Sequence, residues 1–172
     1  MAVLPIRTFG DPVLRRRASE VSVVDEAVRK LMHDMSDTVI DAPGVGLAAP
    51  QIGVPRRVIV WTYEGEGGAL ANPVIVEQHG HDEADEACLS LPGLSYPVPR
   101  ALKVRVMGLN DRGERIEREF TDWTARIMQH EIDHLDGVLF IDRIAPDLAR
   151  QARRRLREAA LSGVPLEPVA AL

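Results

Sequence analysis

The spacing of apolar residues predicts three helices along the chain. From residue 24 to residue 40, apolar side chains recur every three or four positions, as they do on one face of an amphipathic helix. A second helix is expected over residues 121–135. A third begins at Pro146, which suits a first helical position, and ends near Gly163.

Strands are expected between these helices. Residues 58–62 form a run typical of a buried strand, and residues 74–76 form a further short strand. The glycines within residues 65–68 predict a loop between them. Residues 102–109 and 116–120 flank a turn-forming sequence and predict a hairpin. The order of helix, strands, helix and helix favours an α+β fold over a doubly wound α/β sheet.

Composition narrows the class of protein. Hydrophobic residues make up 45% of the 172 residues and charged residues 27%, an ordinary globular balance, so we expect a single domain over residues 1–172. The net charge of −5 gives no global reason to expect nucleic-acid binding. No apolar run approaches the ~20 residues of a membrane span, and the first residues do not form a signal peptide. The single cysteine, Cys88, excludes an internal disulfide, so we expect a cytoplasmic protein.

The strongest local signal for chemistry is the sequence His-Glu-Ile-Asp-His at residues 130–134. On a helix, residues four apart face the same side, so His130 and His134 can bind one metal ion, and Glu131 can reach a water molecule beside it. The alternative is two surface histidines on a charged helix. A catalytic metal site usually needs a third protein ligand. The chain contains no histidine after His134, so Cys88 is the candidate, unless it is only a small buried apolar residue.

Two further segments are unusual. Residues 44–51 read Gly-Val-Gly-Leu-Ala-Ala-Pro-Gln and lack the third glycine and the Lys-Ser/Thr of phosphate-binding loops. Small residues followed by Gln51 suggest a backbone that approaches a ligand closely, with an amide directed at it, although an ordinary turn is the alternative. Cys88 lies in the second segment, residues 86–93.

Through these segments, the chain resembles the peptide deformylase family. Residues 44–51 are similar to its glycine-rich first motif, residues 86–90 to its second, Glu-Gly-Cys-Leu-Ser, and residues 129–134 to its third, Gln-His-Glu-x-Asp-His. The resemblance covers nearly the whole chain. It implies mixed, mainly antiparallel sheets packed around a central helix that carries His-Glu-x-x-His, with a C-terminal helix.

The resemblance also implies a function and a set of roles. The expected reaction is hydrolysis of the N-formyl group from the N-terminal methionine of nascent proteins, with release of formate. The metal ligands implied are Cys88, His130 and His134. Glu131 is expected to act as general base, while the Gln51 amide and the Leu89 backbone N–H stabilise charge on the formyl oxygen. Fe²⁺ is the expected ion in the cell, with Zn²⁺, Ni²⁺ and Co²⁺ as alternatives.

A small, glycine-lined site admits a formyl group and excludes an internal peptide carbonyl. The residues expected to bind substrate are Val45, Gly46, Glu86, Ala87 and Ile127. For Ile127, packing in the core is an alternative. Ala87 replaces the glycine of the family motif, and alanine is strained there if the position needs a positive φ. If the position is extended, the methyl group only crowds the groove.

The last predicted helix is basic in a net-acidic protein. It carries Arg150, Arg153, Arg154, Arg155 and Arg157. These arginines form either a solvated helix face or a surface that docks on the ribosome, where phosphates attract arginine. No membrane partner is expected.

Two other functions remain open from the sequence. A zinc peptidase would keep the two histidines and Glu131 but cleave internal peptide bonds. A deformylase-like binding module would hold a metal without chemistry, and Ala87 is the only feature that favours it.

Overall fold

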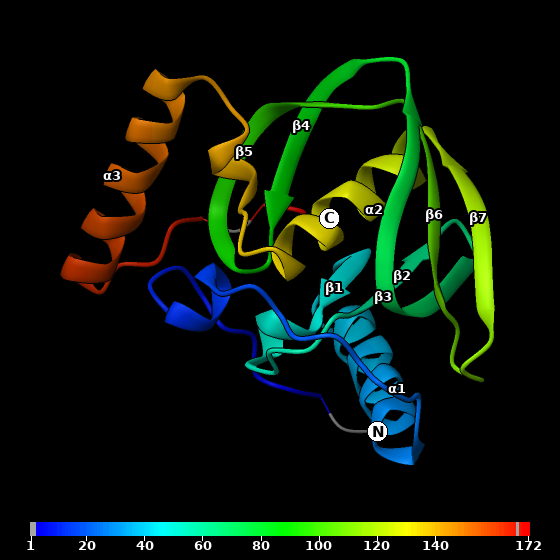
Figure 1. Ribbon diagram of the computed structural model, residues 1–172. Coiled ribbons are helices and arrows are strands. Elements are labelled where there is room, and N and C mark those ends of the chain that lie inside the picture. The colour runs from blue at the N-terminus through cyan, green and yellow to red at the C-terminus, as the bar shows by residue number, and fades with distance from the viewer. Residues whose placement is uncertain (1–2, 168) are drawn as a thin grey trace.

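The computed structural model describes residues 3–167 and 169–172 (Figure 1). Its helices are α1 (Glu26–Asp41), α2 (Asp122–Leu135) and α3 (Pro146–Ser162), with short 3₁₀ turns η1 (Pro12–Arg15), η2 (Ala49–Ile52) and η3 (Phe140–Asp142). Its strands are β1 (Gly46–Ala48), β2 (Val58–Tyr63), β3 (Glu66–His79), β4 (Asp82–Cys88), β5 (Leu91–Arg100), β6 (Lys103–Leu109) and β7 (Arg115–Thr121).

The strands form two separate antiparallel sheets. The larger has the order β1-β2-β3-β6-β7, and the smaller is the β4–β5 hairpin. In Figure 1, α2 runs between the curved larger sheet and the hairpin, while α3 lies at the outer side of the hairpin. The α+β class, the antiparallel sheets, the central helix and the C-terminal helix are therefore confirmed.

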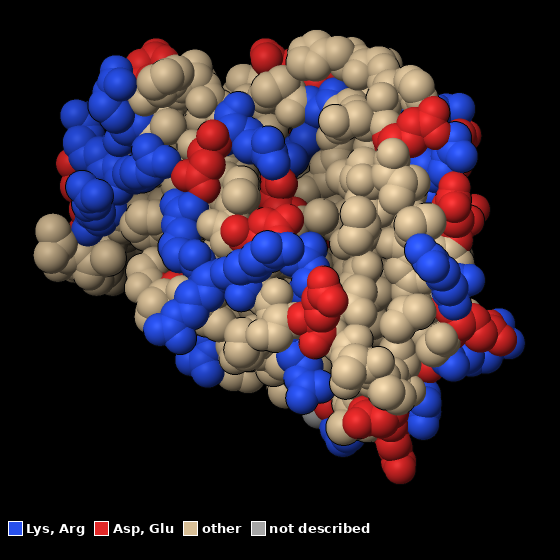
Figure 2. Space-filling model, viewed as in Figure 1, with Lys and Arg blue, Asp and Glu red and all other residues tan. Residues whose placement is uncertain are grey.

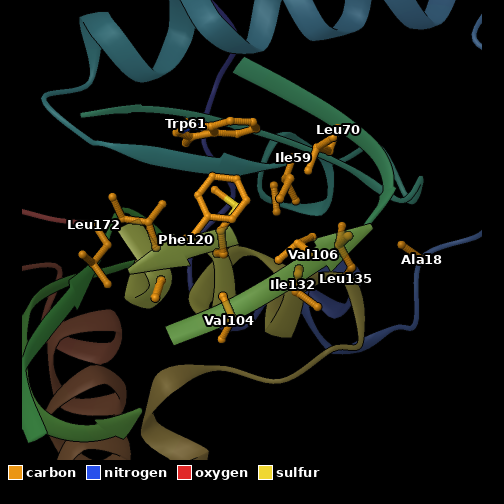
Figure 3. Close-up of a cluster of buried hydrophobic side chains, with 14 residues drawn as sticks. Ala18, Ile59, Trp61, Leu70, Val104, Val106, Phe120, Ile132, Leu135 and Leu172 are labelled. Carbon is orange, nitrogen blue, oxygen red and sulfur yellow. The ribbon is translucent and has the colours of Figure 1, made fainter. Parts of the chain in front are cut away.

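Strand β2 shows how the sequence builds the middle layer. All of residues 58–61 are buried, because helices cover both faces of this strand. Val58 and Val60 pack with residues of α1, whereas Ile59 and Trp61 pack with residues of α2. Alternate side chains of one strand thus join two helices, and Figure 3 shows Ile59 and Trp61 on the α2 side beside Phe120.

The predicted loop at residues 65–68 is wrong beyond its first residues. Gly67 and Gly68 lie inside β3, paired with Thr62 and Trp61 of β2. A Cβ at Gly68 would lie 2.7 Å from the Trp61 ring, and one at Gly67 would lie 2.8 Å from the Trp61 carbonyl oxygen. These glycines make room for an indole rather than for a turn.

The short strand predicted at residues 74–76 is the second half of β3. The sequence conceals this continuity because Asn72 has a φ of 50° and the strand is irregular between Ala71 and Val74. The Asn72 side chain stabilises this conformation by bonding both the backbone N–H and the carbonyl of Val21, each at 2.8 Å.

The β4–β5 hairpin was not expected from the sequence. Strand β5 contains Pro92, Pro97 and Pro99, which normally argue against a strand. In a two-stranded sheet both strands are edges, so a proline can face outward without costing a ladder bond. The apolar side of β5 packs against η3 and α3 through Leu94, Phe140 and neighbouring residues.

The other elements follow the sequence closely. The β6–β7 hairpin pairs Leu109 with Arg115, and α3 ends at Gly163 in a left-handed conformation. The N-cap of α2 is Thr121, which makes no side-chain capping bond. Within the described residues, no helix has the length and apolar character needed to cross a bilayer.

Candidate metal centre

Three ligand-type side chains from distant parts of the sequence meet at one buried point. Cys88 ends β4, while His130 and His134 lie on successive turns of α2. One ligand atom from each lies within 4.8 Å of the other two, and all three residues are buried. The Cys88 Sγ lies 3.3 Å from the His134 Nε2, and the imidazole centroids are 5.0 Å apart. The structure therefore brings the three predicted ligands together.

The Glu86 carboxylate orients His130 from the side away from this point. The Glu86 Oε2 lies 2.8 Å from the His130 Nδ1, which leaves the other ring nitrogen for the cluster. The Arg100 guanidinium donates to both Glu86 oxygens at 2.7 and 2.9 Å, and Arg126 adds a bond at 2.9 Å. A buried carboxylate with these partners keeps its charge and its position.

This ionic network extends along α2. Arg100 also donates to Asp133 at 2.6 Å, and Arg143 donates to the same carboxylate at 2.7 and 2.5 Å. Arg100 and Arg126 were not expected from the sequence, and Asp133, although part of the third motif, was given no role there. A signal for one of them was present, because Arg126 precedes His130 by four residues and so shares its helix face.

The pKa values in the centre follow from burial and from these partners. Burial raises the pKa of Glu131 to about 7. Burial opposes ionisation of Glu86, but hydrogen bonds from Arg100 and His130 outweigh it and hold its pKa well below the ordinary value. Burial also lowers the pKa of His134 well below its usual value. For His130 burial is outweighed by Cys88 and Glu86, which raise the pKa.

Glu131 is packed against the strand of the first motif. A Cβ at Gly46 would overlap the Glu131 Oε1 and lie 2.8 Å from its Cδ. Both carboxylate oxygens are buried and find no hydrogen-bond partner among the residues that the structure describes. A buried carboxylate in this condition is costly unless another group interacts with it. Only glycine at position 46 leaves the space that Glu131 occupies.

The Gln51 side chain is fixed at both ends. Its Oε1 accepts from the Ala48 backbone N–H at 2.7 Å, so its amide nitrogen faces the second motif. There the Nε2 lies 3.6 Å from the Cys88 Sγ and donates to the Ser90 Oγ at 3.3 Å. Gln51 therefore presents an N–H donor beside the cluster, as the sequence suggested for an amide directed at a ligand.

Val45 is half-buried, and the other residues expected to bind substrate, Gly46, Glu86, Ala87 and Ile127, are buried. Val45 precedes Gly46 and packs against the cluster of apolar residues that includes the fully buried Ile127. Ala87 is buried in β4 with an ordinary φ, so the extended alternative holds there and its methyl group is not strained. Leu89 follows Cys88 directly and is half-buried, near Gly44.

The donor set fits a divalent cation. A thiol and two imidazoles are borderline-soft ligands that suit Zn²⁺ or Fe²⁺. The Nδ1 of His134 is buried, like the Glu131 oxygens, without a hydrogen-bond partner among the described residues. The orphaned Glu131 oxygens beside the converged ligand set agree with a centre that a cation and its water complete, whereas the His134 Nδ1 lies on the ring side away from the Cys88 Sγ.

Comparisons with known proteins agree with this geometry. The family model "polypeptide deformylase" matches residues 3–150. The peptide deformylase of Acidothermus cellulolyticus is 52% identical over 163 residues, which cover 95% of this chain and 91% of that protein. The chain belongs to the peptide deformylase family. The known role of the family is to remove the formyl group from nascent peptides, so the chain is a hydrolase of this kind.

Solved structures of the family share the fold. The crystal structure of a peptide deformylase from Legionella pneumophila has a TM-score of 0.87 and 41% identity, covering 95% of this chain and 99% of that chain. The Met-Ala-Ser-bound structure of a class I type b peptide deformylase from Acinetobacter baumannii has a TM-score of 0.80 and 35% identity, covering 83% and 99%. The resemblance inferred from the three motifs is confirmed.

Proposed function

We propose that this deformylase works through a divalent ion held by Cys88, His130 and His134, with Glu131 as its general base. The observation that carries the proposal is the convergence of three ligand atoms within 4.8 Å beside a buried carboxylate without a partner. When bound there, such an ion would supply Lewis-acid chemistry, lowering the pKa of a water molecule and polarising the formyl carbonyl. The remaining chemistry belongs to side chains of this chain.

Glu131 moves the proton. Its carboxylate, with a pKa of about 7 from burial, is matched to accept a proton from water near neutral pH and to return it to the leaving amine. Formate and a free α-amino group result. Gly46 supports this role because it has no side chain and so leaves the space that the Glu131 carboxylate occupies.

Gln51 and Leu89 stabilise the charge that develops on the formyl oxygen. The Gln51 amide is oriented by its bond from Ala48 and presents Nε2 near Cys88. The second proposed donor is the backbone N–H of Leu89, the residue after Cys88. Losing one donor of this kind typically costs ~3–4 kcal/mol of barrier.

The methionine side chain of the substrate binds among Val45, Ala87 and Ile127. Gly46 and Glu86 belong to the same region, Gly46 through its open space and Glu86 through its hold on His130. A relative whose structure contains bound Met-Ala-Ser supports a methionyl peptide as the ligand of this groove. We propose the cytoplasm as the place of action, since nascent chains emerge there.

The ion in the cell is proposed to be Fe²⁺, with Zn²⁺, Ni²⁺ and Co²⁺ as substitutes, because Cys-His₂ sites accept all four. Anaerobic metal analysis combined with formate release from a formyl-methionyl tripeptide tests the site. Wild type should contain one metal per chain and release formate. Cys88→Ser should lose most of both, and retention of full metal content and turnover by Cys88→Ser would contradict the ligand assignment.

Two matched measurements test the rival functions. Incubation with an unformylated peptide should give no internal cleavage products, whereas a peptidase would produce them. The Glu131→Ala variant should release no formate but should still bind metal. If its turnover equals that of the wild type, the activity comes from a contaminant and the binding-module alternative holds.

The basic face of α3 is proposed to dock on the ribosome. Figure 2 shows Lys and Arg side chains gathered over α3 at the edge of the molecule. Part of this charge is already paired, since Arg153 contacts Asp142 at 2.8 Å and Arg154 lies 3.8 Å from Glu158. Changing the exposed Arg150 and Arg157 to Glu should reduce co-sedimentation with ribosomes at low salt. Unchanged co-sedimentation would refute the docking.

A further inference from the structure

The segment that follows α3 returns to the metal centre. After Gly163, the chain passes β5, where a Cβ at Gly93 would lie 2.8 Å from the Glu167 carbonyl oxygen. Leu166 packs there against an apolar cluster. In Figure 1 this red segment runs from α3 to the middle of the molecule, and the C-terminus lies next to α2. The family match ends at residue 150, so this segment is not part of the region that the family model covers.

Leu172 is held at the groove beside Cys88. Its backbone N–H donates to the Ala87 carbonyl at 3.1 Å. Its own carbonyl oxygen lies 3.4 Å from the position that a Cβ would take at Gly44. The side chain is 3% exposed and belongs to the same apolar cluster as Ile127, as Figure 3 shows from its place beside Phe120.

These contacts are the kind that an extended peptide would make in the same groove. A peptide bound alongside a strand pairs its main-chain N–H groups with the strand's carbonyls and inserts alternate side chains into pockets. Leu172 does both, because its N–H donates to the carbonyl of Ala87 and its apolar side chain is buried in the cluster that contains Ile127 and against which Val45 packs. Ala87 is the residue immediately before the proposed ligand Cys88, so Leu172 is held one residue away from the metal centre.

Few buried contacts hold the segment that follows α3 in place. Glu167, Val169 and Ala170 are exposed, with Val169 44% exposed, so the contacts near the end rest chiefly on Leu166 and Leu172. A segment with few buried contacts opens more readily than the elements of the core. Its tether to α3 keeps its local concentration at the groove high when it is released.

We propose that residues 169–172 act as an internal competitor of the formylated substrate, with Leu172 in the place of the substrate's methionine. This inference rests on the proposed function, because it assigns the groove of Val45, Ala87 and Ile127 to that methionine. The substrate binds only after the segment leaves, so the segment raises the apparent KM and leaves kcat unchanged. Short or weakly binding formyl peptides are therefore processed less readily than tight ones.

Steady-state formate release from a formyl-methionyl tripeptide tests the proposal. Leu172→Asp removes the apolar fit, and KM should fall by between about tenfold and a hundredfold, since that is the range set by burial of one leucine. The kcat should stay as in wild type because saturating substrate displaces the segment anyway. Val169→Asp, the control, changes an exposed apolar residue of the same segment and should leave both constants unchanged.

An unchanged KM in Leu172→Asp, or a kcat that falls together with the melting temperature, would overturn the proposal by making the segment a fixed wall of the groove. A synthetic peptide with the sequence of residues 164–172 should inhibit Leu172→Asp competitively with the formyl peptide. Inhibition that is absent or non-competitive would count against competition for the groove.

Amide hydrogen exchange gives a readout that does not depend on turnover. Adding the product-like peptide Met-Ala-Ser to wild type should speed exchange at Leu172, because the peptide takes the Ala87 carbonyl. Bound peptide with unchanged protection at Leu172 would contradict displacement. The two proposals fail differently. If neither wild type nor any variant releases formate, the proposed function is wrong and this inference falls with it. If formate is released but wild type and Leu172→Asp have the same KM, only the proposal of an internal competitor is wrong.

Discussion

At the scale of single residues, the centre depends on space as much as on functional groups. Gly46 leaves no room for a Cβ beside the buried Glu131 carboxylate, and the Gln51 amide is held by hydrogen bonds at both of its ends. Burial is the largest cause that raises the pKa of Glu131 to about 7, with His130 opposing it. The environment, rather than the residue type, gives this glutamate the strength of a base suited to neutral pH.

Gly46→Ala should reduce kcat by about 10²-fold or more, since a Cβ at this position displaces Glu131, and general bases contribute 10²–10⁴-fold. Formate release under saturating substrate measures the loss, with metal content as a check on the ligands. Gly44→Ala is the matched comparison and should cost much less, because its Cβ meets the movable end of Leu89 at 2.9 Å. Equal losses in the two variants would contradict the steric argument.

The sequence identified the chemistry at this scale but not its support. His130, His134 and Cys88 carry recognisable patterns because a metal demands particular atoms at particular spacings. Arg100 and Arg126, in contrast, hold Glu86 through contacts between residues far apart in the chain. No local spacing encodes such contacts, so they became visible only when the fold brought the residues together.

At the scale of elements, the α2 helix is the shared part of the molecule. Its apolar residues join the core under the larger sheet, while Arg126, His130 and Asp133 bind the β4–β5 hairpin or its ends. Helices were predicted well because their period is set locally. The hairpin was missed because its prolines and acidic residues suit an edge, which only the finished topology defines.

Arg126→Met should lower the free energy of unfolding by about 3 kcal/mol, because it removes a buried partner of Glu86 and a bond to the Val98 carbonyl at 2.7 Å. Urea denaturation measures the change. Arg105→Met is the control: its ion pairs with Glu77 and Glu117 are exposed, and their loss should cost at most about 1 kcal/mol. A loss no larger in Arg126→Met would show that Arg100 alone holds Glu86.

Asp142 ties η3 to α3 and η1 in a pH-dependent way. Burial opposes its ionisation, but Arg15 and the Leu139 N–H lower its pKa below the ordinary value. Its contribution is therefore present above that ordinary value and is lost as pH falls through the lowered folded pKa. Asp142→Asn should be less stable than wild type at pH 7, by about 1 kcal/mol, and the difference should shrink toward pH 3. Thermal melts at both pH values measure this, and a constant difference would contradict it.

At the scale of the whole molecule, two packed regions meet at the metal centre. One is the larger sheet with α1 and α2, and the other is the hairpin with η3 and α3. The single domain over residues 1–172 stays a prediction, although α2 contributes to both regions. The proposed ligands come from both of them, Cys88 from the hairpin and His130 and His134 from α2.

Metal removal should lower the melting temperature of the protein. Binding to the folded state alone stabilises it by about 4 kcal/mol at a thousandfold excess over Kd, which corresponds to roughly 10 °C for a chain of this size. Differential scanning fluorimetry with and without a chelator measures the shift. Glu131→Gln should keep most of it, whereas Cys88→Ser should lose it. A chelator shift of the same size in Cys88→Ser would contradict the role of the thiolate.

The placement of Cys88 has a mechanical consequence as well. Because Cys88 lies at the tip of β4, where the hairpin turns back, an ion bound as proposed would fasten the tip of the hairpin to α2. Oxidation or loss of the ion would therefore release the tip of the β4–β5 hairpin from α2. The amide protons near residue 88 should then exchange early, while those of β2 stay protected between α1 and α2. Damage at this single site would thus loosen the whole β4–β5 hairpin.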